Sequence, residues 1–155
     1  MGPRRTPRAR HAKLAATEPP LDLTHALGWF ESLSCDELGT LRQSTDIARH
    51  TQPRNAKAHA AFAAASIAAV RAGFTDDLDE DVSVARAAAE TALGLAPKEP
   101  LVMALSAPAL ADLDPDRAKS LLADAQRELG GRIPASLLKA AEEGAKRPVI
   151  SLGGA

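Results

Sequence analysis

The chain has 155 residues, a length that fits one domain with one hydrophobic core. Aromatic residues make up only 3% of the chain and alanine supplies most of the apolar positions, so the composition favours closely packed helices. The single cysteine excludes an internal disulfide, and no apolar run approaches the ~18 residues of a membrane span. The net charge of -1 conceals an asymmetry, because residues 1–60 carry 9 Lys and Arg against 6 Asp and Glu, whereas residues 61–155 carry 10 against 14.

The chain opens with MGPRRTPRARHAK, a segment that is rich in arginine and free of acids. No apolar stretch follows it, so it does not match a secretory or twin-arginine signal, and we expect a cytoplasmic protein. We predict that residues 1–20 form a disordered basic arm. Such an arm is either a solvated tail or a set of cations that bind nucleic-acid phosphates in a salt-dependent manner. The cations are Arg4, Arg5, Arg8, Arg10 and Lys13.

Residues 21–145 are predicted to form a single all-α domain of about six to seven helices. In the first, within LDLTHALGWFESL, Leu23, Leu27 and Phe30 have helical spacing and Asp22 is available as a cap.

The second predicted helix begins at the S-x-x-E capping box of Ser34 and Glu37 and ends at Gln52 and Pro53. Its apolar face consists of Leu38, Leu41, Thr45 and Ala48. The third runs from about Asn55 to Ala72, and Gly73 is its expected C-terminal stop. Phe62, Ala63, Ile67 and Val70 fall on one stripe of this helix, which is the stripe we expect to be buried.

Two acidic hexapeptides of similar design, DLDEDV (residues 77–82) and DLDPDR (residues 112–117), begin the fourth and sixth predicted helices. Their aspartates match positions 1, 3 and 5 of a calcium loop, but both copies lack the glycine at position 6 and the glutamate at position 12. We therefore predict no metal site. Asp79 and Asp114 are expected to be helix N-caps, each worth about 1 kcal/mol.

The remaining boundaries follow from proline and glycine. The fourth helix is expected to end near Pro97, and the sixth at Gly130 and Gly131. The fifth covers residues 100–110, where Pro108 is expected to kink or shorten it. A seventh helix is predicted over residues 134–143, and residues 146–155 are predicted to be a flexible C-terminal tail.

The fourth and sixth helices repeat at an offset of thirty-three residues. Ala85, Ala88, Ala89, Ala92 and Ala96 recur as Ala118, Leu121, Leu122, Ala125 and Leu129, and Gly73 recurs as Ser106 at expected helix crossings. A helix pair at this period is typical of tetratricopeptide arrays. The segment LVMALSAPALADLDPDRAKSLLADAQRELG resembles one such unit, because Leu105 and Ser106 match its first helix, and Ala118, Leu122 and Ala125 match its second.

This resemblance to tetratricopeptide repeats covers residues 56–130, with Val102 and Ala109 at the positions where the family has aromatic residues. It implies stacked antiparallel helical hairpins that form a superhelical scaffold, whose concave face grips a peptide or a partner protein. A small helical bundle without repeats remains the alternative architecture.

Catalytic patterns are absent from the sequence. His11, His25, His50 and His59 lack the spacing of metal ligands, and Cys35 has two acids beside it that oppose a thiolate. Phosphate-binding glycine loops and the nucleophile elbow are also missing. We therefore expect a protein that is not an enzyme and that has no cofactor.

The leading hypothesis is a non-catalytic adaptor that binds another protein through a groove between helices. The residues expected to line the groove are Phe62, Ile67, Leu101 and Leu105. The hexapeptide acids would also give the molecule an acidic edge that attracts a basic partner. The alternative is a nucleic-acid-associated accessory or regulatory protein that contacts phosphates through its basic arm. Alanine-rich faces would allow self-association in either case, and no membrane partner is expected.

Overall fold

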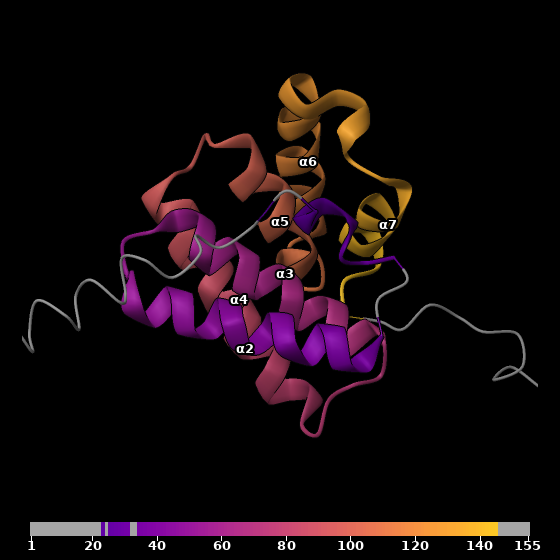
Figure 1. Cartoon of the computed structure of the whole chain (residues 1–155). Coiled ribbons are helices and arrows are strands. Elements are labelled where there is room, and N and C mark those ends of the chain that lie inside the picture. Colours follow the sequence, from indigo (N-terminus) through magenta and orange to yellow (C-terminus); the bar gives the residue numbers. More distant parts are fainter. Residues whose placement is uncertain (1–22, 24, 32–33, 146–155) are drawn as a thin grey trace, which may run out of the picture.

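The computed structural model describes residues 23, 25–31 and 34–145, and these residues are all-helical (Figure 1). The α-helices are α2 (Cys35–Thr51), α3 (Ala56–Arg71), α4 (Leu78–Leu95), α5 (Pro100–Leu110), α6 (Pro115–Leu129) and α7 (Ala135–Glu143). Two 3₁₀ turns accompany them, η1 (Ala26–Gly28) and η2 (Gly130–Arg132). The prediction of an all-α fold with about six helices is confirmed. The basic arm, Asp22 and the C-terminal tail lie outside the described residues.

Local capping explains where α2 and α3 begin. The backbone N–H of Ser34 donates to Glu37 Oε1 at 2.9 Å, and the N–H of Glu37 donates to Ser34 Oγ at 3.1 Å, which completes the predicted capping box. The Asn55 side chain accepts hydrogen bonds from the N–H groups of Lys57 and Ala58 at the start of α3. Gly73, with a φ of 85°, follows the end of α3 as predicted.

The N-cap of α4 differs from the prediction. Asp77, not Asp79, accepts from the Glu80 N–H at 3.1 Å, and Asp79 lies inside the first turn. The cap of α6 is Asp114, as predicted. The two hexapeptides differ because Pro115 restricts the residue before it to extended conformations, so α6 must begin at the proline. The corresponding residue of the first hexapeptide is Glu80, which allows α4 to begin two residues earlier.

The first predicted helix is only the short turn η1. Ala26 is completely buried and Trp29 is 5% exposed, so this segment is anchored by side chains in the core. A segment of this length cannot offset the cost of helix nucleation through its own hydrogen bonds. Leu23, Leu27 and Phe30, which have helical spacing, are half-buried and pack against the same core.

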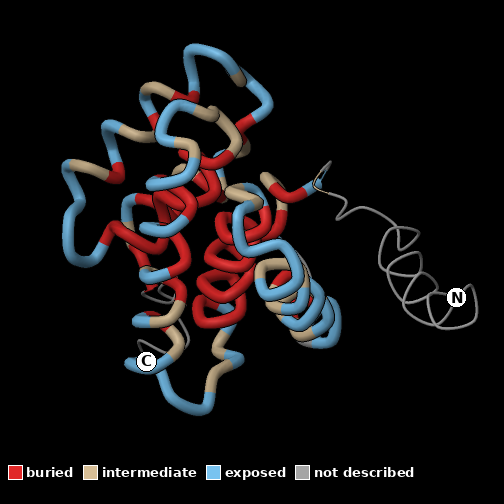
Figure 2. Tube along the Cα trace, turned by 90° about the vertical axis from the view of Figure 1, so that its left-hand side faces the viewer, coloured by how far each residue is buried: buried red, intermediate tan, exposed pale blue. Residues whose placement is uncertain are grey.

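Helix α3 is the centre of the molecule. Every residue from 58 to 71 is buried, so the expected apolar stripe is in fact a helix that is enclosed on all sides. It packs against α2, α4 and α5. Figure 2 shows the buried residues gathered in the middle of the molecule. Alanine makes this enclosure feasible, because a small side chain lets helices approach closely without a large loss of side-chain entropy.

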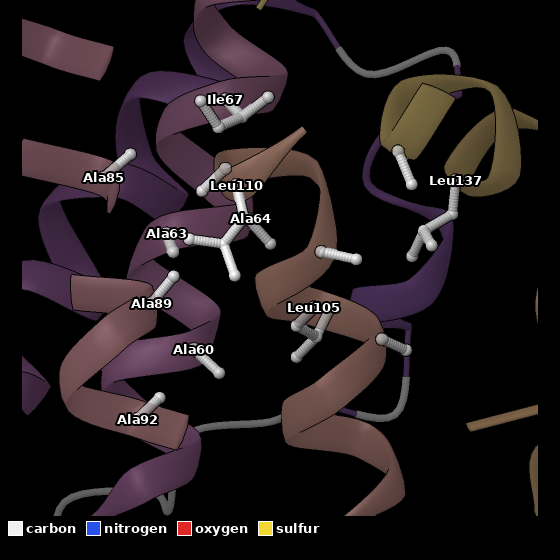
Figure 3. Close-up of a cluster of buried hydrophobic side chains, with 14 of the residues drawn as sticks. Ala60, Ala63, Ala64, Ile67, Ala85, Ala89, Ala92, Leu105, Leu110 and Leu137 are labelled. Atoms are coloured by element: carbon white, nitrogen blue, oxygen red, sulfur yellow. The ribbon is translucent and has the colours of Figure 1, made fainter. Parts of the chain in front are cut away.

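Alanines also form the contact between α3 and α4. In Figure 3, Ala85, Ala89 and Ala92 of α4 lie alongside Ala60 and Ala63 of α3. These five side chains are completely buried. The spacing of three and four residues on each helix places them on one face, so the repeated alanines of the sequence are a packing surface.

The offset of thirty-three residues applies to α4 and α6 but not to the helices that precede them. Gly73 lies beyond the end of α3, whereas Ser106 is buried inside α5. The expectation that Gly73 occupies a helix crossing is therefore wrong.

Helix α5 ends at Leu110, two residues after Pro108, so the proline does not interrupt it earlier. Because the hydrogen bond that Pro108 cannot make falls in the last turn, the helix tolerates it.

Candidate functional site

The four residues predicted to line a groove do not lie together on the surface. Phe62, Ile67 and Leu105 are buried, at 3%, 0% and 0% exposure, because they belong to the two most enclosed helices. Leu101, at the start of α5, is half-buried and lines a cleft. Of these four residues, Leu101 lines this cleft and Phe62 lines a second, smaller groove.

The cleft has a volume of about 1190 Å³ and is here called the N-terminal cleft. One wall is the segment around η1, a second is the first half of α2, and a third is the junction between α6 and α7. Its apolar surface consists of Leu23, Leu27, Trp29, Leu41, Leu101, Leu129 and Pro134. Most of these side chains are half-buried, so the cleft presents an apolar floor to solvent.

The η1 wall is held in place by contacts with distant parts of the chain. The turn packs against α5 and α7 and lies beside α7 in Figure 1. In the close-up of Figure 3, Leu137 of α7 lies near this turn. On the opposite wall, α6 ends at Leu129, and Gly130 has a φ of 55°, a conformation that favours glycine. The turn that follows places Arg132 and Pro134 on the cleft.

Acidic residues dominate the charged part of the cleft. Glu31, Asp36 and Glu37 lie on the side of η1 and α2, and Arg132 lies at the α6–α7 junction. The pKa of Glu37 is lowered, mainly by the hydrogen bond from the Ser34 backbone N–H and further by the Ser34 side chain. The capping box therefore keeps this carboxylate ionised near the cleft. An apolar ligand that carries positive charge matches this arrangement.

The three histidines within the described residues do not belong to a group of metal-binding side chains. His25 lines the N-terminal cleft, His50 contacts Asp46 on α2, and the Nε2 atom of His59 lies 2.8 Å from the Pro53 carbonyl oxygen. In the part of the chain that the structure describes, no three His, Cys, Asp or Glu side chains are grouped as metal ligands. His11 and the Cys35 side chain are outside that part.

No described helix is both long and apolar enough to cross a bilayer.

A second groove of about 520 Å³ lies between α2 and α4. The Arg49 guanidinium lies 4.0 Å from the centre of the Phe62 ring, and Arg42 forms a 2.6 Å ion pair with Asp81. Phe74, 43% exposed, closes one end of this groove. Positive and negative groups on this surface already pair with one another, so it has less unmatched charge than the N-terminal cleft.

The apolar residues around η1 are evident in the sequence, but their role as a cleft wall is not. Their only signal was a group of large apolar side chains, including the single tryptophan, in a chain that is otherwise rich in alanine. The fold that brings them against α5 and α7 depends on contacts between residues that are far apart in the sequence.

No protein-family model matches the chain, and searches of curated proteins and of solved structures found no significant match.

Proposed function

We propose that the protein is a non-catalytic binding module of the cytoplasm that holds a short segment of another protein in the N-terminal cleft. The observation that carries this proposal is the combination of an apolar floor with an acidic rim in a cleft of about 1190 Å³. Ligand sites are typically concave, mostly apolar and equipped with a few charged groups that orient the ligand. The segment that fits is amphipathic, with leucine-like side chains on one face and lysine or arginine beside them.

The packing order of the helices supports a scaffold of stacked hairpins. Helices α3 and α4 pack as one pair and α5 and α6 as the next, while α3 packs against α5 and α5 against α7. In a tetratricopeptide-like array, the first helix of each pair would line the inner face. The η1 turn packs against α5 and α7. A ligand would then enter beside η1, where the N-terminal cleft opens.

A pair of synthetic peptides tests the charge preference of the cleft. One is an amphipathic peptide of leucine and lysine, and the other has each lysine replaced by glutamate. Trp29 is the single tryptophan and lines the cleft, so its fluorescence reports binding to the full chain directly. We expect the basic peptide to shift the emission of Trp29 with a Kd at least 10-fold lower than that of the acidic peptide. Equal affinity for both peptides would contradict the role assigned to the acidic rim.

Two leucine variants locate the binding site. Leu101→Glu places a charge on the apolar floor and should weaken binding of the basic apolar peptide at least 10-fold. The matched control is Leu95→Glu, since Leu95 is 42% exposed on α4 and lies outside the cleft. Circular dichroism would establish that both variants remain folded. Unchanged binding by a folded Leu101→Glu variant would exclude the cleft as the binding site.

A further inference from the structure

A separate pocket lies between the two acidic hexapeptides and has a volume of about 780 Å³. The first hexapeptide contributes Leu78, Asp79 and Val82, and the second contributes Asp112 and Pro115. Helix α7 contributes Glu142 and Glu143, and Ala145 follows it. We call it the C-terminal pocket. It lies apart from the N-terminal cleft and shares no lining residue with it. The two hexapeptides are thus related by a shared cavity as well as by similar sequence.

The chain leaves α7 at the edge of this pocket in a fixed direction. Arg71 at the end of α3 donates to the Gly144 carbonyl oxygen at 2.9 Å and pairs with Glu143 at 2.9 Å. The Ala145 N–H donates to Asp112 Oδ2 at 3.3 Å. Gly144 has a φ of 67°, which turns the backbone between these two contacts. Residue 146 therefore starts from a backbone position that α3 and the second hexapeptide hold together.

The lining of the pocket complements the residues that follow in sequence. Asp79, Asp112 and Glu142 give it negative charge, with Arg86 as the one cation among the lining residues. Leu78 is 50% exposed and places an apolar side chain beside these charges. The next residues are KRPVI, two cations followed by proline and two β-branched apolar residues.

We propose that residues 146–150 bind back into the C-terminal pocket of the same chain. Lys146 and Arg147 face Asp79 and Glu142, and Val149 and Ile150 cover Leu78 and Val82. Five extended residues span up to about 17 Å, at ~3.4 Å each, and the segment needs no linker because Ala145, which precedes it, already lines the pocket. Covalent attachment favours this occupant over a separate basic peptide, because a short tether gives an effective concentration in the millimolar range.

Paramagnetic broadening in the full chain tests this placement. A nitroxide label is attached to Ser151→Cys in a Cys35→Ser background, and methyl spectra are recorded for Leu78, Val82 and Leu41. The proposal expects the Leu78 and Val82 methyl signals to lose most of their intensity, while Leu41 in the N-terminal cleft keeps its intensity. Equal intensity for all three methyl groups, relative to the reduced label, would overturn the proposal.

Charge variants and dilution separate specific binding from mere proximity. The double variant Lys146→Glu and Arg147→Glu should restore the Leu78 and Val82 intensities by at least threefold. The control is Lys139→Glu, an exposed cation of α7 outside the pocket, which should leave the broadening unchanged. Broadening that survives the double variant would refute the charge pairing. Broadening that disappears on tenfold dilution would refute binding within one chain and assign the pocket to a second copy.

Discussion

The addition of a single methyl group at Gly144 should destabilise the fold strongly. Its φ of 67° and ψ of -134° are accessible mainly to glycine, and an added Cβ would overlap the Asp112 carboxylate. That carboxylate cannot move away without losing its hydrogen bond from Ala145. We expect Gly144→Ala to lower the free energy of unfolding by about 2 to 3 kcal/mol, measured by urea denaturation.

The matched control for this substitution is Gly94→Ala. Gly94 lies in α4, and a Cβ at this position would meet nothing within 4 Å. Alanine is the better helix former, so this variant should be stabilised by up to about 1 kcal/mol. A loss of stability in both variants would show that the Gly144 effect does not arise from its backbone conformation and its contact with Asp112.

Asp81 should make stability depend on pH in the acid range. Burial raises its pKa, but hydrogen bonds from Arg42 and Thr75 and the charge of Arg42 outweigh this effect, so the pKa lies below the ordinary value of 3.8. A lowered folded-state pKa means that the carboxylate stabilises the fold at pH values above 3.8 and that this contribution is lost as the pH falls through the folded-state pKa. Asp81→Asn should therefore cost about 1 to 3 kcal/mol at pH 7 and progressively less below pH 3.8.

The measurement compares unfolding free energies of Asp81→Asn and of the unaltered chain at pH 7 and at successively lower pH. Asp46→Asn is the control, since Asp46 pairs with Arg49 three residues along α2 and its side chain is 44% exposed. An exposed pair of this kind should contribute less than about 1 kcal/mol. A destabilisation by Asp81→Asn that stays constant from pH 7 to pH 2 would contradict the assigned ion pair.

Among the helices, close packing between α3 and α4 should be sensitive to side-chain volume on one face only. Ala89 is completely buried against α3, so Ala89→Leu should destabilise the fold by about 1 to 3 kcal/mol or more through overpacking. Ala87 lies two residues away on the exposed face of α4. Ala87→Leu should change stability by less than ~0.5 kcal/mol. Equal effects in thermal unfolding would show that α3 and α4 do not pack through these alanines.

The sequence predicted the helix boundaries well because their causes are local. Ser34 and Glu37 form a capping box within four residues, Asn55 caps α3, and Pro100 begins α5, as proline favours the first turn of a helix. The same local reasoning misplaced one cap, because Asp77 and Asp79 are both suitable caps and only the helix start decides between them.

Burial and the N-terminal cleft could not be predicted in this way. Alanine is compatible with both the surface and the core, so the pattern of α3 did not reveal that Phe62 lies in a helix enclosed on all sides. The N-terminal cleft requires η1 to pack against α5 and α7, which are about 70 to 115 residues away in sequence. Of the four residues predicted to line a groove between helices, only Leu101 lies at this cleft.

At the scale of the whole molecule, a small apolar cluster of Leu38, Ala68 and Ala69 joins α2 to α3, and a large one joins most of the other described elements. The large cluster extends from Ala26 and Trp29 through α3, α4 and α5 to α7. The N-terminal cleft is therefore built on the core itself, and its η1 wall depends on the same contacts that stabilise the fold. A cluster of this kind favours cooperative unfolding of a small domain as one unit.

We expect η1 to unfold together with the helices. Trp29 is 5% exposed in the shared cluster and is the single tryptophan, so its emission reports η1 while circular dichroism reports the helices. In a urea titration the two midpoints should coincide, because releasing Trp29 exposes core residues of α5 and α7. A Trp29 transition at clearly lower urea would show instead that η1 detaches first, as a movable wall of the N-terminal cleft. Peptide binding would then raise the Trp29 midpoint more than the helical one, since a ligand stabilises the state to which it binds.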